Sequence, residues 1–264
     1  AQGAAPANFR RAAGSRHRNG PTAGARVRPG RRPPVNGRPG TAVKICGLRT
    51  ARDVEAAAQA GARYAGLVFF PRSPRNLSVD EAAALALAAP DGIARVGLFV
   101  NPTDADLDHV LASVALDIVQ LHGAEPPARV AQVRARTGLP VIKAVGVAGP
   151  GDLPALTDYG IVADILLIDA KPPKDAALPG GNGLAFDWSL LAGRRFLRPW
   201  MLAGGLTPGN GAEAIRLTRA PAVDVSSGVE SAPGVKDAGL IRDFVKAATG
   251  ATATTGATAP DATR

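Results

Sequence analysis

The sequence contains very little cysteine and no long hydrophobic segment. Its single cysteine, Cys46, excludes an internal disulfide and a metal cluster built from several thiolates. No apolar stretch approaches the roughly 20 residues that a transmembrane helix needs, and the N-terminal residues lack the apolar core of a secretory signal. One thiol in 264 residues fits a reducing compartment. We therefore expect a cytoplasmic protein without a membrane partner.

Acidic residues are missing from the first 40 positions, which contain nine arginines and account for the net charge of +9. In the remaining sequence, basic and acidic residues are equal in number. Residues 1–40 are rich in Gly, Pro, Ala and Arg, which predicts a disordered extension. A nucleic-acid arm and an Arg-rich transit peptide are the functional alternatives. We favour a dispensable extension and expect no specific nucleic-acid partner. The Ala/Thr/Gly-rich residues 250–264 predict a flexible C-terminal tail.

Residues 41–249 alternate eight times between short strand-like segments and helical ones. Strands are predicted over 42–46, 64–70, 94–100, 117–122, 140–145, 163–169, 198–203 and 222–225. Helices are predicted over 50–60, 79–89, 104–113, 126–136, 152–158, 187–192, 209–219 and 236–248. This alternation indicates a parallel sheet, and eight such units fit a single closed α/β barrel, the (β/α)8 or TIM barrel. An open doubly wound sheet is the alternative, but no G-x-G-x-x-G motif follows the first strand. We expect this barrel to be the catalytic domain.

Polar side chains stand at the carboxyl ends of several predicted strands, opposite the aliphatic face. They are Cys46, His122, Asp169 and Ser226. Because side chains alternate between the two faces of a strand, these groups should point into the barrel, at the end where such barrels have their active sites. A thiol there can exchange a proton if its pKa is lowered, although most free cysteines are small buried hydrophobes.

Other charged residues, Lys44, Lys143 and Asp224, share the inward face. A charge buried inside a barrel needs a partner. We therefore assign Lys44 and Lys143 a mainly structural role.

Two glycine-bearing loops follow the last two predicted strands, at 203–208 and 224–229. Glycine lets backbone N–H groups approach a ligand closely, and helix N-termini favour anions. Loops after the seventh and eighth strands are a common phosphate site in these barrels. The two loops together predict a phosphate ligand, and a third loop at 180–183 could close over a sugar.

Several motifs occur in a specific order: KICG at 44–47, FPRSPR at 70–75, VQLHG at 119–123, GGNG at 180–183 leading into FDW at 186–188, LAGGL at 202–206 and VDVSSGVE at 223–230. In this order they resemble the phosphoribosylanthranilate isomerase family of tryptophan biosynthesis. The resemblance runs from about residue 42 to 248. Ala203 stands where the family often has serine, and Asn182 departs from a Gly-Gly-Ser-Gly loop.

The resemblance implies an Amadori rearrangement of N-(5-phosphoribosyl)anthranilate to 1-(2-carboxyphenylamino)-1-deoxyribulose 5-phosphate, without a metal or cofactor. It makes Cys46 the general base and Asp169 the general acid. Burial should raise the pKa of the acid, and positive charge, with Lys44 nearby, should lower the pKa of the base.

By the same resemblance Arg75 would bind the anthranilate carboxylate, with Arg72 as its competitor. His122 would hydrogen-bond the substrate, and Asp224 would orient sugar hydroxyls or pair with Lys44. The residues expected to hold the phosphate are Gly183, Gly204, Gly205, Ser226, Ser227 and Gly228. We expect a small phosphorylated substrate and a monomer or homodimer.

Three alternatives remain open. Indole-3-glycerol phosphate synthase is another phosphate-binding barrel, but it relies on lysine and glutamate where this chain has Cys46 and Asp169. A bifunctional isomerase of histidine and tryptophan synthesis would have a carboxylate pair instead of the thiol. A nucleic-acid-binding module would act through residues 1–40.

Overall fold

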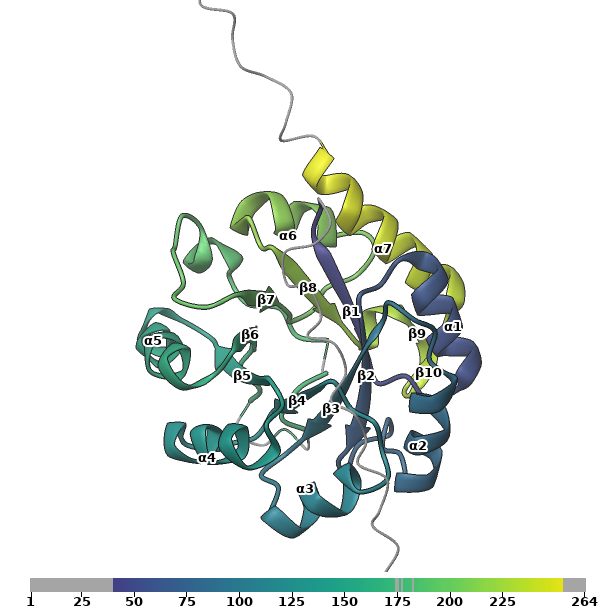
Figure 1. Cartoon of the computed structure of the whole chain (residues 1–264). Coiled ribbons are helices and arrows are strands. Elements are labelled where there is room, and N and C mark those ends of the chain that lie inside the picture. Colours follow the sequence, from purple (N-terminus) through teal and green to yellow (C-terminus); the bar gives the residue numbers. More distant parts are fainter. Residues whose placement is uncertain (1–39, 174–175, 177, 182, 254–264) are drawn as a thin grey trace, which may run out of the picture.

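The chain folds into a closed barrel of eight parallel strands surrounded by helices (Figure 1). The structure is a computed structural model and describes residues 40–173, 176, 178–181 and 183–253. Strand β1 pairs with both β2 and β8, and this pairing closes the ring. The (β/α)8 barrel expected from the alternation is therefore confirmed. The predicted extension and most of the predicted C-terminal tail lie outside the described residues.

The barrel strands are β1 (Ala42–Cys46), β2 (Tyr64–Phe69), β3 (Ala94–Phe99), β4 (Ile118–Leu121), β5 (Val141–Val147), β6 (Ile165–Ala170), β7 (Trp200–Leu202) and β8 (Ala222–Val225). The helices are α1 (Ala51–Ala60), α2 (Val79–Ala88), α3 (Asp104–Leu111), α4 (Pro127–Thr137), α5 (Leu153–Val162), α6 (Gly211–Thr218) and α7 (Ala238–Ala253), with 3₁₀ turns η1 (Pro150–Asp152), η2 (Trp188–Leu191) and η3 (Ser227–Val229). α7 packs against α1 and α6 and so covers the closure of the ring (Figure 1). In the described part of the chain, no helix has both the length and the apolar character to cross a membrane.

Local sequence signals explain where several helices begin. The Ser78 hydroxyl accepts a hydrogen bond from the Glu81 N–H at the start of α2, and the Glu81 carboxylate accepts one from the Ser78 N–H. Thr103 and Asp106 form the same reciprocal capping box at α3. Such boxes satisfy N–H groups that have no partner inside the helix. They fix the residues at which α2 and α3 begin.

The two faces of the strands bury different side chains, as the alternation predicted. Val43, Ile45 and Val223 belong to the larger aliphatic cluster between the strands and the helices. A smaller cluster fills the barrel interior, with Ile142 and Leu167 among its members. The inward polar residues Lys44, Gln120 and Lys143 are also buried within the barrel. Side chains therefore fill the barrel interior below the carboxyl ends of the strands, and open space remains at those carboxyl ends.

Three segments differ from the sequence prediction. Instead of the sixth predicted helix over 187–192 there is only the 3₁₀ turn η2, because the chain leaves helical geometry at Ala192 and Gly193 takes a φ of +71°. A small hairpin of β9 (Glu230–Ala232) and β10 (Val235–Lys236) was not predicted. Its turn contains Pro233 and Gly234, a pair typical of turns. Finally, α7 continues to Ala253, beyond the expected end of the barrel domain at 249.

Candidate active site

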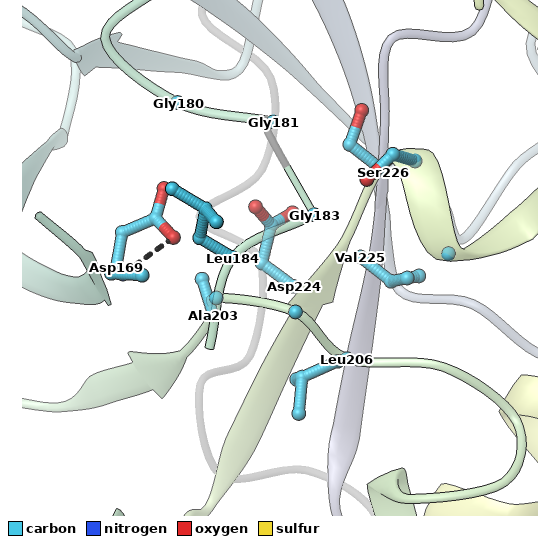
Figure 2. A pocket seen from close by; sticks show the side chains of 15 residues that line it. Asp169, Gly180, Gly181, Gly183, Leu184, Ala203, Leu206, Asp224, Val225 and Ser226 are labelled. Atoms are coloured by element: carbon cyan, nitrogen blue, oxygen red, sulfur yellow. Dashed lines mark hydrogen bonds between the residues drawn. The ribbon is translucent and has the colours of Figure 1, made fainter. Parts of the chain in front are cut away.

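Two adjoining pockets open at the carboxyl ends of the barrel strands. Both are lined by Asp169, Gly180, Gly181, Asp224 and Ser226, so they form one continuous cleft. Figure 2 shows the loop of Gly180 and Gly181 passing over one of the two pockets, with the Asp169 and Asp224 carboxylates below it.

The cleft brings together every residue that the sequence nominated for the site. One pocket adds Cys46, Arg75 and His122 to the shared residues. The other adds Gly183, Gly204, Gly205, Ser227 and Gly228. The exposed Arg72 lines neither pocket, whereas Arg75 is buried and lines the first. Among the described residues, no group of three His, Cys, Asp or Glu side chains could hold a metal ion.

Cys46 is the last residue of β1, and its side chain is buried at the floor of the cleft. Gly66 is its neighbour on β2, where an added Cβ would lie 3.1 Å from the thiol sulfur and 3.2 Å from Lys44 Nζ. Burial raises the pKa of the Cys46 thiol, although the positive charges of Lys44 and Lys236 oppose that shift. The expectation of a lowered thiol pKa is therefore wrong, because the desolvation of the thiolate outweighs the attraction of the two lysines.

Lys44 and Asp224 form a buried ion pair beneath the thiol, with 2.8 Å between Lys44 Nζ and Asp224 Oδ1. They are opposite each other in the register of β1 and β8. Burial would lower the pKa of Lys44, but Asp224 and Cys46 together more than compensate, and the pKa is raised. Of the two roles foreseen for Asp224, the structure contains the pairing with Lys44. Lys143 is likewise paired, with 2.7 Å between its Nζ and Glu125 Oε2.

Asp169 lies on β6 and is part of a short polar chain. Its Oδ2 is 3.3 Å from His122 Nε2, and its Oδ1 accepts a hydrogen bond from the Ala170 N–H at 2.8 Å. On the other side of the ring, Gln120 Nε2 is 2.9 Å from His122 Nδ1. An amide nitrogen can only donate, so Nδ1 accepts and the imidazole proton of a neutral His122 is on Nε2. His122 Nε2 therefore presents its N–H on the side of Asp169 Oδ2, which is 3.3 Å from the nitrogen.

Arg75 reaches the cleft from the connection between β2 and α2. Its side chain passes close to Gly47, where an added Cβ would lie 2.4 Å from Arg75 Cδ. Gly47 has a φ of +78°, so this position favours glycine for its backbone as well. Arg75 Nε donates to Glu230 Oε1 at 2.7 Å, and Nη2 donates to Glu230 Oε2 at 2.9 Å. The guanidinium is thus held in a fixed plane at the wall of the cleft.

At the other end of the cleft, the backbone of the loops after β7 and β8 packs closely against neighbouring segments. Gly204 and Gly205 both have positive φ, and an added Cβ at Gly204 would lie 2.8 Å from the Ala170 nitrogen. At Gly228 an added Cβ would meet the Leu206 carbonyl oxygen at 1.9 Å. These contacts leave no room for a side chain at Gly204 or Gly228, so the backbone of both loops borders this end of the cleft, together with Ser226 and Ser227. The loop between β6 and η2 comes near, since a Cβ at Gly183 would lie 3.7 Å from Ser227 Oγ.

Sequence reasoning missed three residues around the cleft: Gln120, Glu230 and Lys236. Gln120 lies in the motif VQLHG and Glu230 in the motif VDVSSGVE, and their positions in these motifs could have indicated a place near the site. Lys236 had no signal of its own, because its place depends on the hairpin of β9 and β10.

Comparisons with known proteins agree with this geometry. A family model described as N-(5'-phosphoribosyl)anthranilate (PRA) isomerase matches residues 43–247. The chain belongs to the phosphoribosylanthranilate isomerase family. A relative named N-(5'-phosphoribosyl)anthranilate isomerase from Paracoccus denitrificans is 72% identical over 207 residues, which are 78% of this chain and 96% of the relative.

Solved structures give the same family. One of them contains monomers generated from the dimeric phosphoribosylanthranilate isomerase of Thermotoga maritima, with 38% identity and a TM-score of 0.69. Another is a phosphoribosyl anthranilate isomerase in complex with reduced 1-(o-carboxyphenylamino)-1-deoxyribulose 5-phosphate, with 38% identity and a TM-score of 0.70. Each match covers 80% of this chain and 99% of the other.

Proposed function

We propose that the protein is a phosphoribosylanthranilate isomerase that converts N-(5-phosphoribosyl)anthranilate into 1-(2-carboxyphenylamino)-1-deoxyribulose 5-phosphate, in tryptophan biosynthesis. The observation that carries this proposal is the arrangement of Cys46 and Asp169. They stand on β1 and β6, at separate points of the ring, and line the same cleft. A sugar between them is accessible to an acid from one side and to a base from the other.

In the proposed first step, the protonated Asp169 carboxyl gives its proton to the furanose ring oxygen. The bond between that oxygen and C1 breaks, and the lone pair of the anthranilate nitrogen forms a C1=N double bond. His122 Nε2, which is 3.3 Å from Oδ2, supports this role, because an N–H group next to the carboxylate stabilises the charge that remains. The backbone N–H of Ala170 does the same at Oδ1.

In the proposed second step, the Cys46 thiolate removes the proton from C2. The electron pair of that bond forms a C1=C2 double bond, and the iminium electrons return to nitrogen. The resulting enol becomes the ketone when C1 gains a proton and the C2 hydroxyl loses one, so the overall reaction is an isomerisation. Lys44 supports the thiolate because its positive charge opposes the effect of burial on the pKa of the thiol.

The loops after β7 and β8 are proposed to hold the phosphate. The support for this is the close backbone packing at Gly204, Gly205 and Gly228, and the presence of Ser226 and Ser227 in the lining of the same pocket. Arg75 is proposed to bind the anthranilate carboxylate at the other end. The oligomeric state, monomer or homodimer, stays a prediction.

The function is tested by identifying the product. Purified protein should convert phosphoribosylanthranilate into a compound of equal mass whose ¹³C spectrum has a ketone carbon at C2. An unchanged substrate would reject the proposed isomerase.

A further inference from the structure

A buried cluster of three charges borders the cleft at Arg75. Lys236 Nζ is 2.7 Å from Glu230 Oε1, the same oxygen that accepts the hydrogen bond from Arg75 Nε. The side chains of Arg75, Glu230 and Lys236 are 7%, 4% and 0% exposed. The cluster thus lies away from water and has one positive charge in excess.

Glu230 has no capacity left for a further partner. Its Oε2 accepts from Arg75 Nη2 at 2.9 Å and from the Gly234 N–H at 3.2 Å, while Oε1 accepts from Arg75 and Lys236. The unpredicted hairpin supplies this arrangement, because Glu230 and Lys236 are register partners on β9 and β10. The hairpin therefore holds the Glu230 carboxylate against Arg75.

One edge of the Arg75 guanidinium makes no contact with the Glu230 carboxylate. Glu230 occupies the edge formed by Nε and Nη2, and Nη2 also donates to the Gly181 carbonyl oxygen at 3.4 Å. Nη1 makes no hydrogen bond within the part of the chain that the structure describes. Nη1 faces Gly181, where an added Cβ would lie 2.9 Å away. Because Gly181 and Arg75 line the same pocket as Cys46, this free edge belongs to the cleft.

Lys236 determines the charge of this edge. Without it, Arg75 and Glu230 would cancel, and a substrate anion would gain little from approaching the pair. With it, a buried positive charge lacks its counterion, and such a charge is costly until an anion pairs with it. Lys236 Nζ also donates to the Ser226 carbonyl oxygen at 2.9 Å, which ties the cluster to the loop after β8.

We propose that Glu230 and Lys236 are positioning residues: together they present the free edge of Arg75 to the aryl carboxylate of the substrate, and so make the enzyme prefer a carboxylated phosphoribosyl-arylamine to one without the carboxylate. This inference rests on the proposed isomerase function. In this inference Glu230 fixes the orientation of the Arg75 guanidinium, and Lys236 supplies the excess positive charge.

The test compares two substrates, N-(5-phosphoribosyl)anthranilate and N-(5-phosphoribosyl)aniline, which lacks the carboxylate. For the wild-type protein, kcat/KM should favour the first. Glu230→Gln keeps the size of the side chain but loses the second acceptor oxygen that fixes the Arg75 guanidinium, so the preference should fall by about tenfold or more, the range for a hydrogen bond to a charged group. Turnover of the aniline compound should change much less, since it makes no use of the Arg75 edge.

Two further variants separate positioning from stability. Lys236→Gln leaves the Arg75–Glu230 pair in place and should also reduce the preference. Asp117→Asn is the matched control, because Asp117 holds Arg95 by the same two-point contact at the other end of the barrel. It should lower the melting temperature and leave the preference unchanged.

The outcomes are distinct. A wild-type protein inactive on both substrates would reject the proposed function. A wild-type protein active on both with equal kcat/KM would overturn the inference without any variant. Variants at Glu230 and Lys236 that lose activity equally on both substrates would also overturn it, because that loss is the mark of a merely structural role.

Discussion

Two arginines, one at each end of the barrel, make the same contact with a carboxylate in different surroundings. Arg95 near the N-terminal ends of the strands donates to Asp117 from Nε at 2.8 Å and from Nη2 at 2.9 Å. Arg75 at the C-terminal ends donates to Glu230 from the same two nitrogens. The geometry of the pairs is almost identical.

The difference lies in what remains of each guanidinium. Arg95 also donates from Nη1 to the Ala86 carbonyl oxygen at 3.3 Å, and its pair is electrically neutral. Arg75 Nη1 has no hydrogen-bond partner among the described residues and lies beside Gly181 at the cleft, and Lys236 adds a positive charge. The same contact thus stabilises the structure at one end, and at the other it leaves the guanidinium edge that we propose for the substrate carboxylate. This agrees with the general division of such barrels into a stabilising face and an active face.

The largest expected effect of this division is on turnover. Cys46→Ala and Asp169→Ala should each lower kcat by about 10²–10⁴-fold, as expected for the loss of a general acid or base. Both variants should keep the far-ultraviolet circular dichroism spectrum of the barrel. A folded Cys46→Ala protein with near-normal kcat would remove the thiol from the mechanism.

A substitution in the loops that we propose to hold the phosphate should weaken substrate binding and leave the proton transfers unaffected. Gly228→Ala places a Cβ against the Leu206 carbonyl oxygen, so the two loops must move apart. Overpacking of this kind costs about 1–3 kcal/mol of stability. KM for the substrate should rise, and inhibition by inorganic phosphate should weaken. Isothermal titration with phosphate measures this directly, and unchanged affinity would contradict the proposed site.

The pH dependence should show how the thiol is controlled. The base acts as a thiolate and burial raises the pKa of the thiol, so kcat/KM should rise with pH up to that pKa. Lys44 opposes the effect of burial, and Lys44→Met should therefore move the rising limb to higher pH.

Lys143→Met is the matched control for this pH experiment. It also removes a buried, carboxylate-paired lysine from the barrel, but Lys143 does not contribute to the pKa of Cys46. The limb should stay in place. If the rise of kcat/KM moved to higher pH by the same amount in both variants, the shift would come from a general disturbance of packing inside the barrel and not from the loss of the Lys44 charge.

The smallest kinetic effect is expected at the N-terminal end. Asp117→Asn weakens the contact with the partly exposed Arg95, and we expect a loss of about 1–3 kcal/mol in the free energy of unfolding. Urea denaturation measures this loss. The value of kcat should remain within about twofold, and a much larger decrease would mean that the two ends of the barrel are coupled.

Much of the site was predictable because it depends on short-range patterns. Period-two alternation puts Cys46 and Asp169 on the inward face of their strands, and parallel strands carry their carboxyl ends to one side. The glycines at 204–205 and 228 mark turns whose backbone must come close to its neighbours. Their residue types therefore predict where a ligand can approach.

The remaining features depend on contacts between distant parts of the chain. Arg75 and Glu230 are separated by 155 positions, and nothing in the local sequence says that they meet. The direction of the thiol pKa depends on how deeply Cys46 is buried, which the strand pattern does not give. For the same reason the sequence left Asp224 with two roles, until the register of β1 and β8 brought it beside Lys44.

The central claim is that Cys46 and Asp169 act together on phosphoribosylanthranilate across one cleft. The most direct test follows the loss of substrate fluorescence with the purified full-length protein, beside a double variant that carries Cys46→Ala and Asp169→Ala. The account predicts rapid loss with the wild type and only the spontaneous decay of the substrate with the double variant. Equal rates for the two proteins would contradict it.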